Sequence, residues 1–173
     1  FRMPLVNFKK SGQVATITLN DEDRLNAMSL AMGKEFRALI RHLAKDKGIR
    51  VVILTGAGRA FSSGGNLDMI SGLCGKPKAK TAADLKKFYK LFLGIRDIPQ
   101  IVIAAINGAA VGAGFCLAMA CDLKYAAASA KMGANFARIG LAPGMAGTSL
   151  ITRLSGPVIA SEILLTGKIF DAQ

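Results

Sequence analysis

Two apolar stretches, each followed at once by a glycine-rich turn, constrain this chain more than any other feature. The first reads VVILTGAGRAFSSGGNL from Val51, and the second reads IVIAAINGAAVGAGFCL from Ile101. Each pattern predicts a buried strand, a tight turn and then a helix. A helix that begins at such a turn presents backbone N–H groups without intrahelical acceptors, and these can hold a phosphate or an oxyanion. The turns can equally serve only to close strand–helix corners.

Strands and helices alternate along the rest of the chain. Segment 13–20 alternates apolar and polar residues as a half-buried strand does. Ser29 can cap a helix that runs to about Lys45, because its side chain can accept a hydrogen bond from the first turn. The residues expected on the buried face of this helix are Met32, Phe36, Leu39, Ile40 and Leu43.

Further elements complete the pattern. Thr81 and Asp84 look like a capping box that begins another helix. The residues that this helix is expected to turn inward are Leu85, Phe88, Leu91, Phe92 and Ile95. The remaining expected elements are a buried helix after the second turn, a strand at 122–128 and helices at 148–154 and 157–166. This alternation predicts an α/β fold, and no linker or low-complexity tract divides residues 1–173, so we expect one core domain.

Composition limits the class of protein. Half of the residues are hydrophobic, which indicates a globular chain, and no apolar run approaches the length of a membrane span. Three irregularly spaced cysteines indicate a reducing compartment, so we expect a cytoplasmic protein, or one of the mitochondrial matrix if a leader was removed before Phe1. Lys and Arg outnumber Asp and Glu by 23 to 11, which favours an anionic partner without identifying it.

The glycine turns do not match the nucleotide-binding motifs. A dinucleotide-binding turn requires a third glycine three residues after the second, and the residues at those positions are Phe61 and Leu117. A Walker A motif is absent, and so is the G-x-S-x-G turn of serine hydrolases. A dinucleotide fold is therefore compatible with the pattern of elements but has no motif to support it.

The ordered motifs resemble those of the enoyl-CoA hydratase/isomerase family, also called the crotonase family. The resemblance rests on AFSSGGNLDM and on PQIVIAAINGAAVGAGFCLAMACDLKYAAASAKMG, and it is extended by LAPGMAGTSLITRLSG and EILLTGKIFDAQ. With NAM at Asn26, it covers almost the whole chain. It implies a spiral of repeated strand–strand–helix units with an acyl-CoA bound across the two turns. It also implies that no separate cofactor is used, because coenzyme A is part of the substrate.

The resemblance assigns roles to the two turns. In this family two backbone N–H groups hold the thioester carbonyl oxygen, and by motif these belong to Gly65 and Ala113. The assignment makes physical sense, because a thioester enolate develops negative charge on that oxygen. Ser63 and Leu67 are expected beside the thioester and pantetheine, and Arg24 is a candidate for contact with the CoA phosphates. No Cys, His and Asp cluster has the spacing of metal ligands.

The sequence departs from the hydratases of the family at two positions. The two glutamates that handle water and the proton in those enzymes fall, by motif, on Cys116 and Phe136. We expect Cys116, Phe136 and Gly144 at the substrate pocket, and we do not expect efficient hydration. Other charged residues have simpler explanations. We expect His42 on a helix surface and Asp68 as a solvated carboxylate at a helix start. We expect Asp122 to form a hydrogen bond to nearby backbone. Arg138 is expected to bind either an acyl carboxylate or a surface acid.

Two statements about partners follow from the resemblance. The family forms trimers and dimers of trimers, largely through a C-terminal helical region, which is expected beyond Gln173. One branch resembles an RNA-binding hydratase with a lysine-rich helix, which makes RNA the alternative partner. The lysines that would contact RNA here are Lys76, Lys78, Lys80, Lys86, Lys87 and Lys90, although a solvated helix face is the simpler explanation for them.

Overall fold

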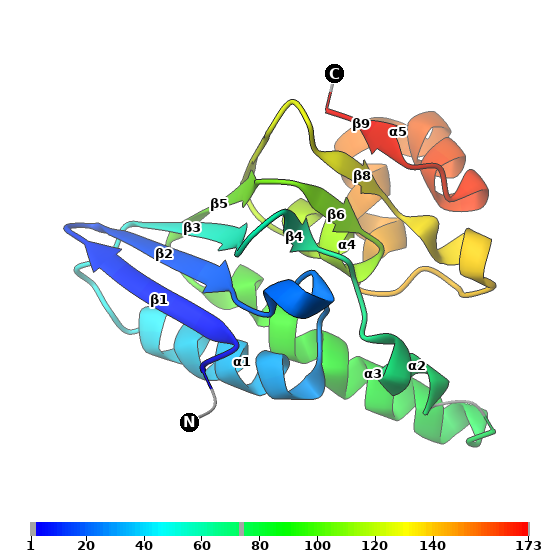
Figure 1. Cartoon of the computed structure of the whole chain (residues 1–173), viewed down its shortest axis with the longest axis horizontal. Helices are drawn as coiled ribbons and strands as arrows, with labels where there is room; N and C mark the ends of the chain where they lie inside the picture. Colours follow the sequence, from blue (N-terminus) through cyan, green and yellow to red (C-terminus); the bar gives the residue numbers. More distant parts are fainter. Residues whose placement is uncertain (1–2, 73–74, 173) are drawn as a thin grey trace.

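The strands form two sheets in the part of the chain that the computed structural model describes, which is residues 3–72 and 75–172 without the side chain of Leu67. The larger sheet has the order β1-β2-β3-β5-β7, in which β1 is antiparallel to β2 and the other pairs are parallel. Its strands are β1 (Val6–Ser11), β2 (Val14–Leu19), β3 (Val51–Gly56), β5 (Ile101–Ile106) and β7 (Leu123–Ala126). Figure 1 shows this sheet above two long helices.

The smaller sheet has the order β4-β6-β8-β9, in which β9 is antiparallel to β8 and the other pairs are parallel. Its strands are β4 (Ala60–Ser62), β6 (Ala109–Val111), β8 (Lys131–Gly133) and β9 (Phe170–Asp171). The helices are α1 (Leu30–Leu43), α2 (Leu67–Ser71), α3 (Lys78–Leu93), α4 (Ala113–Met119) and α5 (Gly147–Thr166). Short 3-10 turns occupy Glu22–Arg24, Gly94–Asp97 and Asn135–Ile139.

The two sheets arise from one repeated unit. Twice in succession, from β3 and from β5, a strand joins the larger sheet, the next strand joins the smaller sheet, and a helical segment returns the chain to the larger sheet. A third pair, β7 and β8, is followed by α5 and then by β9 in the smaller sheet. Equivalent strands align in register, with Val52 beside Val102 in the larger sheet and Ala60 beside Ala109 in the smaller. The α/β spiral of strand–strand–helix units that the sequence predicted is therefore confirmed.

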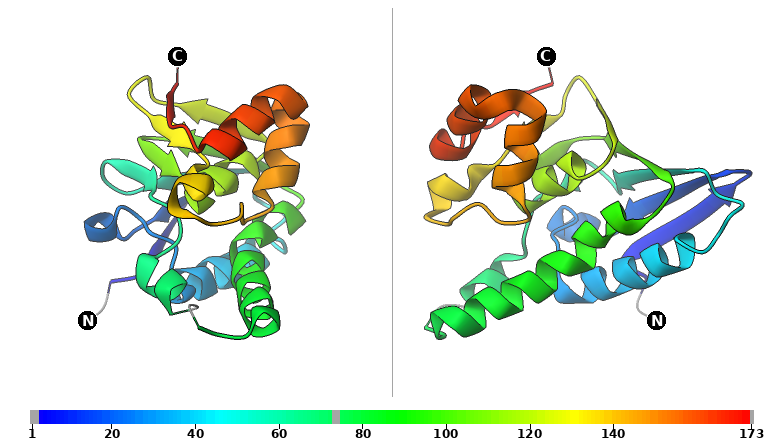
Figure 2. Two further views of the ribbon diagram at one scale, coloured as in Figure 1. Left: turned by 90° about the vertical axis from the view of Figure 1, so that its right-hand side faces the viewer. Right: turned by 180° about the vertical axis from the view of Figure 1, so that it is seen from behind.

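Helix α1 forms as its sequence predicts. The Ser29 side chain accepts a hydrogen bond from the Met32 N–H at 3.2 Å, which caps the helix start. The apolar face is buried and packs against α3, where Phe36 and Phe92 place their ring centroids 5.5 Å apart. Figure 2 shows α1 and α3 side by side beneath the larger sheet. These two helices therefore cover one face of that sheet.

Helix α3 begins earlier than the capping-box prediction placed it. Its first residue is Lys78, Pro77 occupies the cap position, and the Thr81 N–H already donates to the Pro77 carbonyl oxygen at 3.0 Å. The prediction of a Thr81 cap was wrong because Pro77, with its fixed φ, suits a helix start, and the residues after it continue the helix. The inward face was predicted correctly, since Phe88 and Phe92 are buried on it.

Helix α5 consists of two helical segments joined by a break. Gly156 has φ 76° and ψ 166°, which is non-helical, and Pro157 follows it directly. The two C-terminal helices expected at 148–154 and 157–166 are therefore confirmed, with the break at the glycine between them. No helix in the described residues is long and apolar enough to cross a membrane.

Candidate active site

The first glycine turn presents one backbone donor away from the protein. Met28 pairs with this turn as an isolated parallel bridge, donating to the Gly64 carbonyl oxygen at 2.7 Å and accepting from the Asn66 N–H at 3.0 Å. In such a bridge the residue between the two bonds directs its own N–H to the opposite side. That residue is Gly65, whose N–H has no acceptor among the described residues.

The second turn presents another free donor at the start of α4. Gly112 has φ 55° and ψ −120°, donates to the Gly133 carbonyl oxygen at 2.8 Å and accepts from the Cys116 N–H at 3.1 Å. Ala113 is the first residue of α4, so its N–H has no partner within the helix. Within the described chain no other acceptor reaches it. Gly65 and Ala113 thus each carry an unpaired N–H group, one on each turn.

The glycines bring these turns into direct contact. A Cβ at Gly64 would lie 2.7 Å from the Val111 carbonyl oxygen and 3.3 Å from the Ala113 nitrogen. A Cβ at Gly114 would lie 2.5 Å from the Ser62 carbonyl oxygen. Contacts below 3 Å with backbone leave no space for a side chain, so glycine is required for this close approach. The glycine motifs therefore set the separation of the two donors.

The Asn26 side chain forms hydrogen bonds to backbone groups around the first turn. Its Oδ1 accepts from the Asp21 N–H at 2.9 Å, and its Nδ2 donates to the carbonyl oxygens of Ala57 at 2.9 Å and Ala60 at 2.8 Å. The Ser62 hydroxyl donates to the Asn26 carbonyl oxygen at 2.8 Å. Asn26 is fully buried, so each polar group of its side chain has a protein partner.

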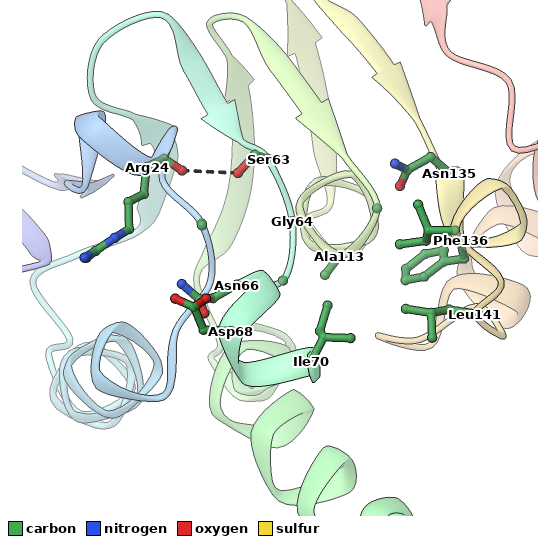
Figure 3. Close-up of a pocket in the computed structure, with 14 residues that line it drawn as sticks. Arg24, Ser63, Gly64, Asn66, Asp68, Ile70, Ala113, Asn135, Phe136 and Leu141 are labelled. Carbon is green, nitrogen blue, oxygen red and sulfur yellow. Dashed lines mark hydrogen bonds between the residues drawn. The ribbon is translucent and has the colours of Figure 1, made fainter. Parts of the chain in front are cut away.

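Two adjoining cavities meet at Gly65 and Ala113, the residues that carry the unpaired N–H groups. The larger has a volume of about 560 Å³ and the smaller about 320 Å³. Residues that line both cavities are Gly65, Ile70, Ala113, Phe136 and Leu141. Figure 3 shows Ala113 and Ile70 between the first-turn residues on one side and Asn135, Phe136 and Leu141 on the other. Both N–H groups therefore lie on the boundary between the cavities.

The larger cavity holds the polar side chains predicted for the site. Arg24 and Ser63 line it together with the two donors, and so does Asp68, which was expected only as a solvated carboxylate at a helix start. The Ser63 hydroxyl donates to the Arg24 carbonyl oxygen at 3.2 Å, as Figure 3 shows, while the Arg24 side chain points away from Ala113. That side chain is 67% exposed and lies 3.7 Å from the Asp21 carboxylate, so it is accessible to an anion at the cavity mouth but already has an acidic neighbour. Leu67 begins α2, and its side chain lies outside the described residues.

The two positions of the family glutamates have different surroundings. Phe136 lines both cavities, whereas Cys116 is fully buried and is not among the residues that line either one. Burial raises the pKa of the Cys116 thiol to about 12. A Cβ at Gly147 would lie 2.8 Å from the Cys116 sulfur, so little free space surrounds it. Neither residue can carry a proton in the way that a carboxylate does near neutral pH.

Tyr89 lies in the site although no motif of the sequence assigned it a role there. It comes from α3, is half-buried, and lines the smaller cavity beside Gly65 and Ala113. Its hydroxyl abuts Gly144, the third residue predicted for the substrate pocket, since a Cβ there would lie 2.2 Å from it. Burial raises the pKa of Tyr89, and the nearby Cys116 adds to the rise. The sequence signal that could have pointed to Tyr89 is its position on the helix, directly after the buried Phe88.

The remaining predicted residues lie outside the cavities. The Asp122 carboxylate accepts from the Val102 N–H at 2.8 Å, which confirms its local backbone role, and His42 is exposed on α1. Arg138 is exposed and packs its aliphatic part beside Gly167. In the described residues no group of three or more Cys, His, Asp or Glu could hold a metal ion. The aromatic residues among the α3 lysines, Phe88 and Tyr89, line the smaller cavity.

Comparisons with known proteins agree with this arrangement. The family model described as Enoyl-CoA hydratase/isomerase matches residues 9–173. A relative named "Probable enoyl-CoA hydratase EchA14", from Mycobacterium tuberculosis, is 39% identical over 160 residues, covering 92% of this chain and 61% of its own length. The 1,2-epoxyphenylacetyl-CoA isomerase of Escherichia coli is 35% identical over 161 residues, covering 92% and 62%. The chain thus spans about three fifths of these relatives.

Solved structures share the fold. An enoyl-CoA hydratase/carnithine racemase from Magnetospirillum magneticum superimposes with a TM-score of 0.90 at 37% identity, covering 99% of this chain and 64% of that one. A structure from Thermobifida fusca in complex with acetoacetyl-CoA gives a TM-score of 0.84 at 33% identity, covering 98% and 69%. With its repeated strand–strand–helix units and its family-model match, the chain belongs to the enoyl-CoA hydratase/isomerase (crotonase) family.

Proposed function

We propose that this chain binds an acyl-CoA thioester and stabilises its enolate through the N–H groups of Gly65 and Ala113. The observation that carries the proposal is that both N–H groups are unpaired and lie on the boundary of the same two cavities. An oxygen held between two backbone donors gains the most when it becomes an enolate, because its negative charge then grows. Loss of one such donor typically lowers the rate by about 10²–10³-fold.

The two cavities would hold different parts of the acyl-CoA ligand. The larger cavity, with Ser63 on its wall and Arg24 at its mouth, suits pantetheine and the CoA phosphates. The smaller cavity is lined largely by apolar side chains, which suits the acyl chain. Acetoacetyl-CoA in the Thermobifida fusca neighbour supports this class of ligand. No further cofactor is needed, because the thioester itself is the activated group.

We propose that water addition is not the efficient reaction of this site. Hydration requires one group to activate water and another to deliver a proton to the α carbon, and each typically contributes about 10²–10⁴-fold. The residues at the two positions are Phe136, which has no exchangeable proton, and Cys116, whose pKa is raised to about 12 by burial. Isomerisation or decarboxylation remains compatible with the donors alone, since a decarboxylation generates its own enolate.

Calorimetry with a short acyl-CoA tests the binding proposal. We expect saturable binding to the wild-type chain. Absence of binding by the folded protein at millimolar acyl-CoA would refute the proposal, and a thermal melt of the same sample establishes that it is folded.

A hydration assay tests the proposed chemistry. Loss of the conjugated thioester absorbance of a short trans-2-enoyl-CoA should be about 10⁴-fold or more slower than with a two-glutamate hydratase. The Cys116→Glu, Phe136→Glu double variant should gain activity over both single variants. Turnover equal to that of a two-glutamate hydratase, unchanged in Cys116→Ala, would show that an acid and base lie elsewhere.

A further inference from the structure

Tyr89 places a hydroxyl in the apolar half of the site. The smaller cavity is lined by Met69, Leu85, Phe88 and further apolar side chains, and among its described lining residues none is charged. Thr81 and Tyr89 supply the side-chain hydroxyls of this wall. The Tyr89 hydroxyl makes no hydrogen bond to any other described residue. An occupant that displaces solvent from this wall and offers an acceptor keeps the hydroxyl hydrogen-bonded, whereas an alkyl chain leaves it without a partner.

The surroundings keep this hydroxyl in its donating form. The groups that face Tyr89 are the Phe88 ring, with centroids 5.8 Å apart, the Gly144 backbone and the buried Cys116 thiol. None of them carries a charge near neutral pH. Burial raises the pKa of Tyr89 above its ordinary value, so the hydroxyl stays protonated and donates.

From this geometry we infer that the Tyr89 hydroxyl donates a hydrogen bond to an oxygen on the acyl chain, and that the site selects acyl-CoA thioesters with a hydroxyl or keto group over plain alkyl thioesters. The inference rests on the proposed acyl-CoA function and names the substrate class of that site. Tyr89 lines the cavity together with Gly65 and Ala113, so a thioester held at these donors directs its acyl chain past the hydroxyl.

Four-carbon CoA thioesters separate this inference from the proposed function. Butyryl-, 3-hydroxybutyryl- and 4-hydroxybutyryl-CoA differ only in the presence and place of one oxygen. Binding of butyryl-CoA to the wild type tests the proposed function by itself. We expect the tighter-binding of the two hydroxylated thioesters to bind about fivefold to tenfold more tightly than butyryl-CoA. The difference is modest because a neutral hydrogen bond contributes little free energy at a half-exposed position.

Matched variants assign this preference to one hydroxyl. Tyr89→Phe should remove the preference, so that the three thioesters bind with affinities within about twofold of one another. The chain has two tyrosines, and the second, Tyr125, is 65% exposed on β7, so Tyr125→Phe should keep the preference. A preference that persists in Tyr89→Phe, or equal weakening of all three thioesters in that variant, would overturn the inference.

Two further measurements remain decisive if Tyr89→Phe does not fold. Gly144→Ala places a methyl group where the Tyr89 hydroxyl lies, so it should remove the preference while the hydroxyl is still present. The chain has no tryptophan, so in Tyr125→Phe the fluorescence comes from Tyr89. It should change more with the oxygenated thioester than with butyryl-CoA at equal saturation. Equal changes with both thioesters, or an intact preference in Gly144→Ala, would contradict the inference.

Discussion

At the scale of single residues, Gly64 illustrates why the first turn needs glycine. Its φ is 100°, and a Cβ there would lie 2.7 Å from a backbone oxygen of the second turn. We expect Gly64→Ala to lower the free energy of unfolding by about 1–3 kcal/mol and to weaken acyl-CoA binding, because the two turns must move apart. Urea unfolding and calorimetry measure these effects.

Gly140 offers the matched control for this substitution. It also has a positive φ, 68°, but a Cβ there would have no atom within 4 Å. Gly140→Ala should therefore cost about 1–2 kcal/mol from the backbone alone and leave acyl-CoA affinity unchanged. Equal loss of binding in both variants would show that contact between the turns does not set the donor positions.

The Asn26 side chain connects three backbone groups near the site. Asn26→Ala would leave the carbonyl oxygens of Ala57 and Ala60 without this donor in a buried place. We expect a loss of about 3 kcal/mol in the free energy of unfolding. In Asn20→Ala, whose amide donates to Pro4 in an exposed position, the loss should stay below about 1 kcal/mol. Similar losses in both variants, measured by urea unfolding, would contradict this role.

Part of the site was predictable from the sequence at this scale, and part was not. The positions of Gly65 and Ala113 follow from ordered motifs, because a glycine turn is a local feature of the chain. Tyr89 was not predictable, since its place depends on contact with Gly144, which follows 55 positions later along the sequence. Periodicity assigned Phe88 and Phe92 to the core but could not show what the neighbouring helical position would face.

At the scale of elements, the break within α5 depends on one backbone conformation. Gly156 combines φ 76° with ψ 166°, a region that is essentially restricted to glycine. No atom lies within 4 Å of a Cβ built there, so any cost of a side chain comes from the backbone. We expect Gly156→Ala to lower the free energy of unfolding by about 1–3 kcal/mol.

Gly12 is the control for that prediction. It has φ 57° and no atom within 4 Å of a Cβ, but this φ lies in the left-handed region that other residues adopt at smaller cost. Urea unfolding should therefore show a larger loss for Gly156→Ala than for Gly12→Ala. A smaller loss would show that the break before Pro157 accepts a backbone conformation that alanine adopts readily.

The elements also differ in how well the sequence predicted them. The long helices α1 and α3 follow from apolar residues at helical spacing, strand β2 from alternation of apolar and polar residues, and strands β3 and β5 from continuous apolar runs. The strands β4 and β6 have three residues each and lie within stretches that looked like glycine turns. Such short strands carry no periodic signal, and they exist because their neighbours in the smaller sheet supply hydrogen-bond partners.

At the scale of the whole molecule, the division into two sheets was implied only by the family resemblance. Alternation of strands and helices predicts an α/β fold but does not indicate that successive strands belong to different sheets. The glycine-rich stretches allow this separation, because the chain changes direction between β3 and β4 and again between β5 and β6. The unpaired donors follow the second strand of each pair, Gly65 after β4 and Ala113 after β6, so the same glycine-rich stretches that redirect the chain also contain the site.

Buried thiols should make the stability of the whole chain fall at alkaline pH. Burial raises the pKa of both Cys116 and Cys121 from 9.0 to about 12. Above pH 9 the unfolded chain therefore releases protons that the folded chain retains, and the free energy of unfolding decreases as the pH rises toward 12. Each cysteine contributes about 1.4 kcal/mol per pH unit in that window, and below pH 9 its contribution is fully retained.

Urea unfolding at pH 8 and pH 10 measures this effect for one thiol at a time. Cys121→Ala should shrink the difference between the two pH values by about 1.4 kcal/mol, because the cavity it leaves affects both measurements equally. Leu117→Ala is the matched control: it removes a fully buried side chain without a thiol, so it should lower stability at both pH values and leave their difference unchanged. An unchanged difference in Cys121→Ala would show that the folded chain releases the Cys121 proton as readily as the unfolded chain, which its burial in the core argues against.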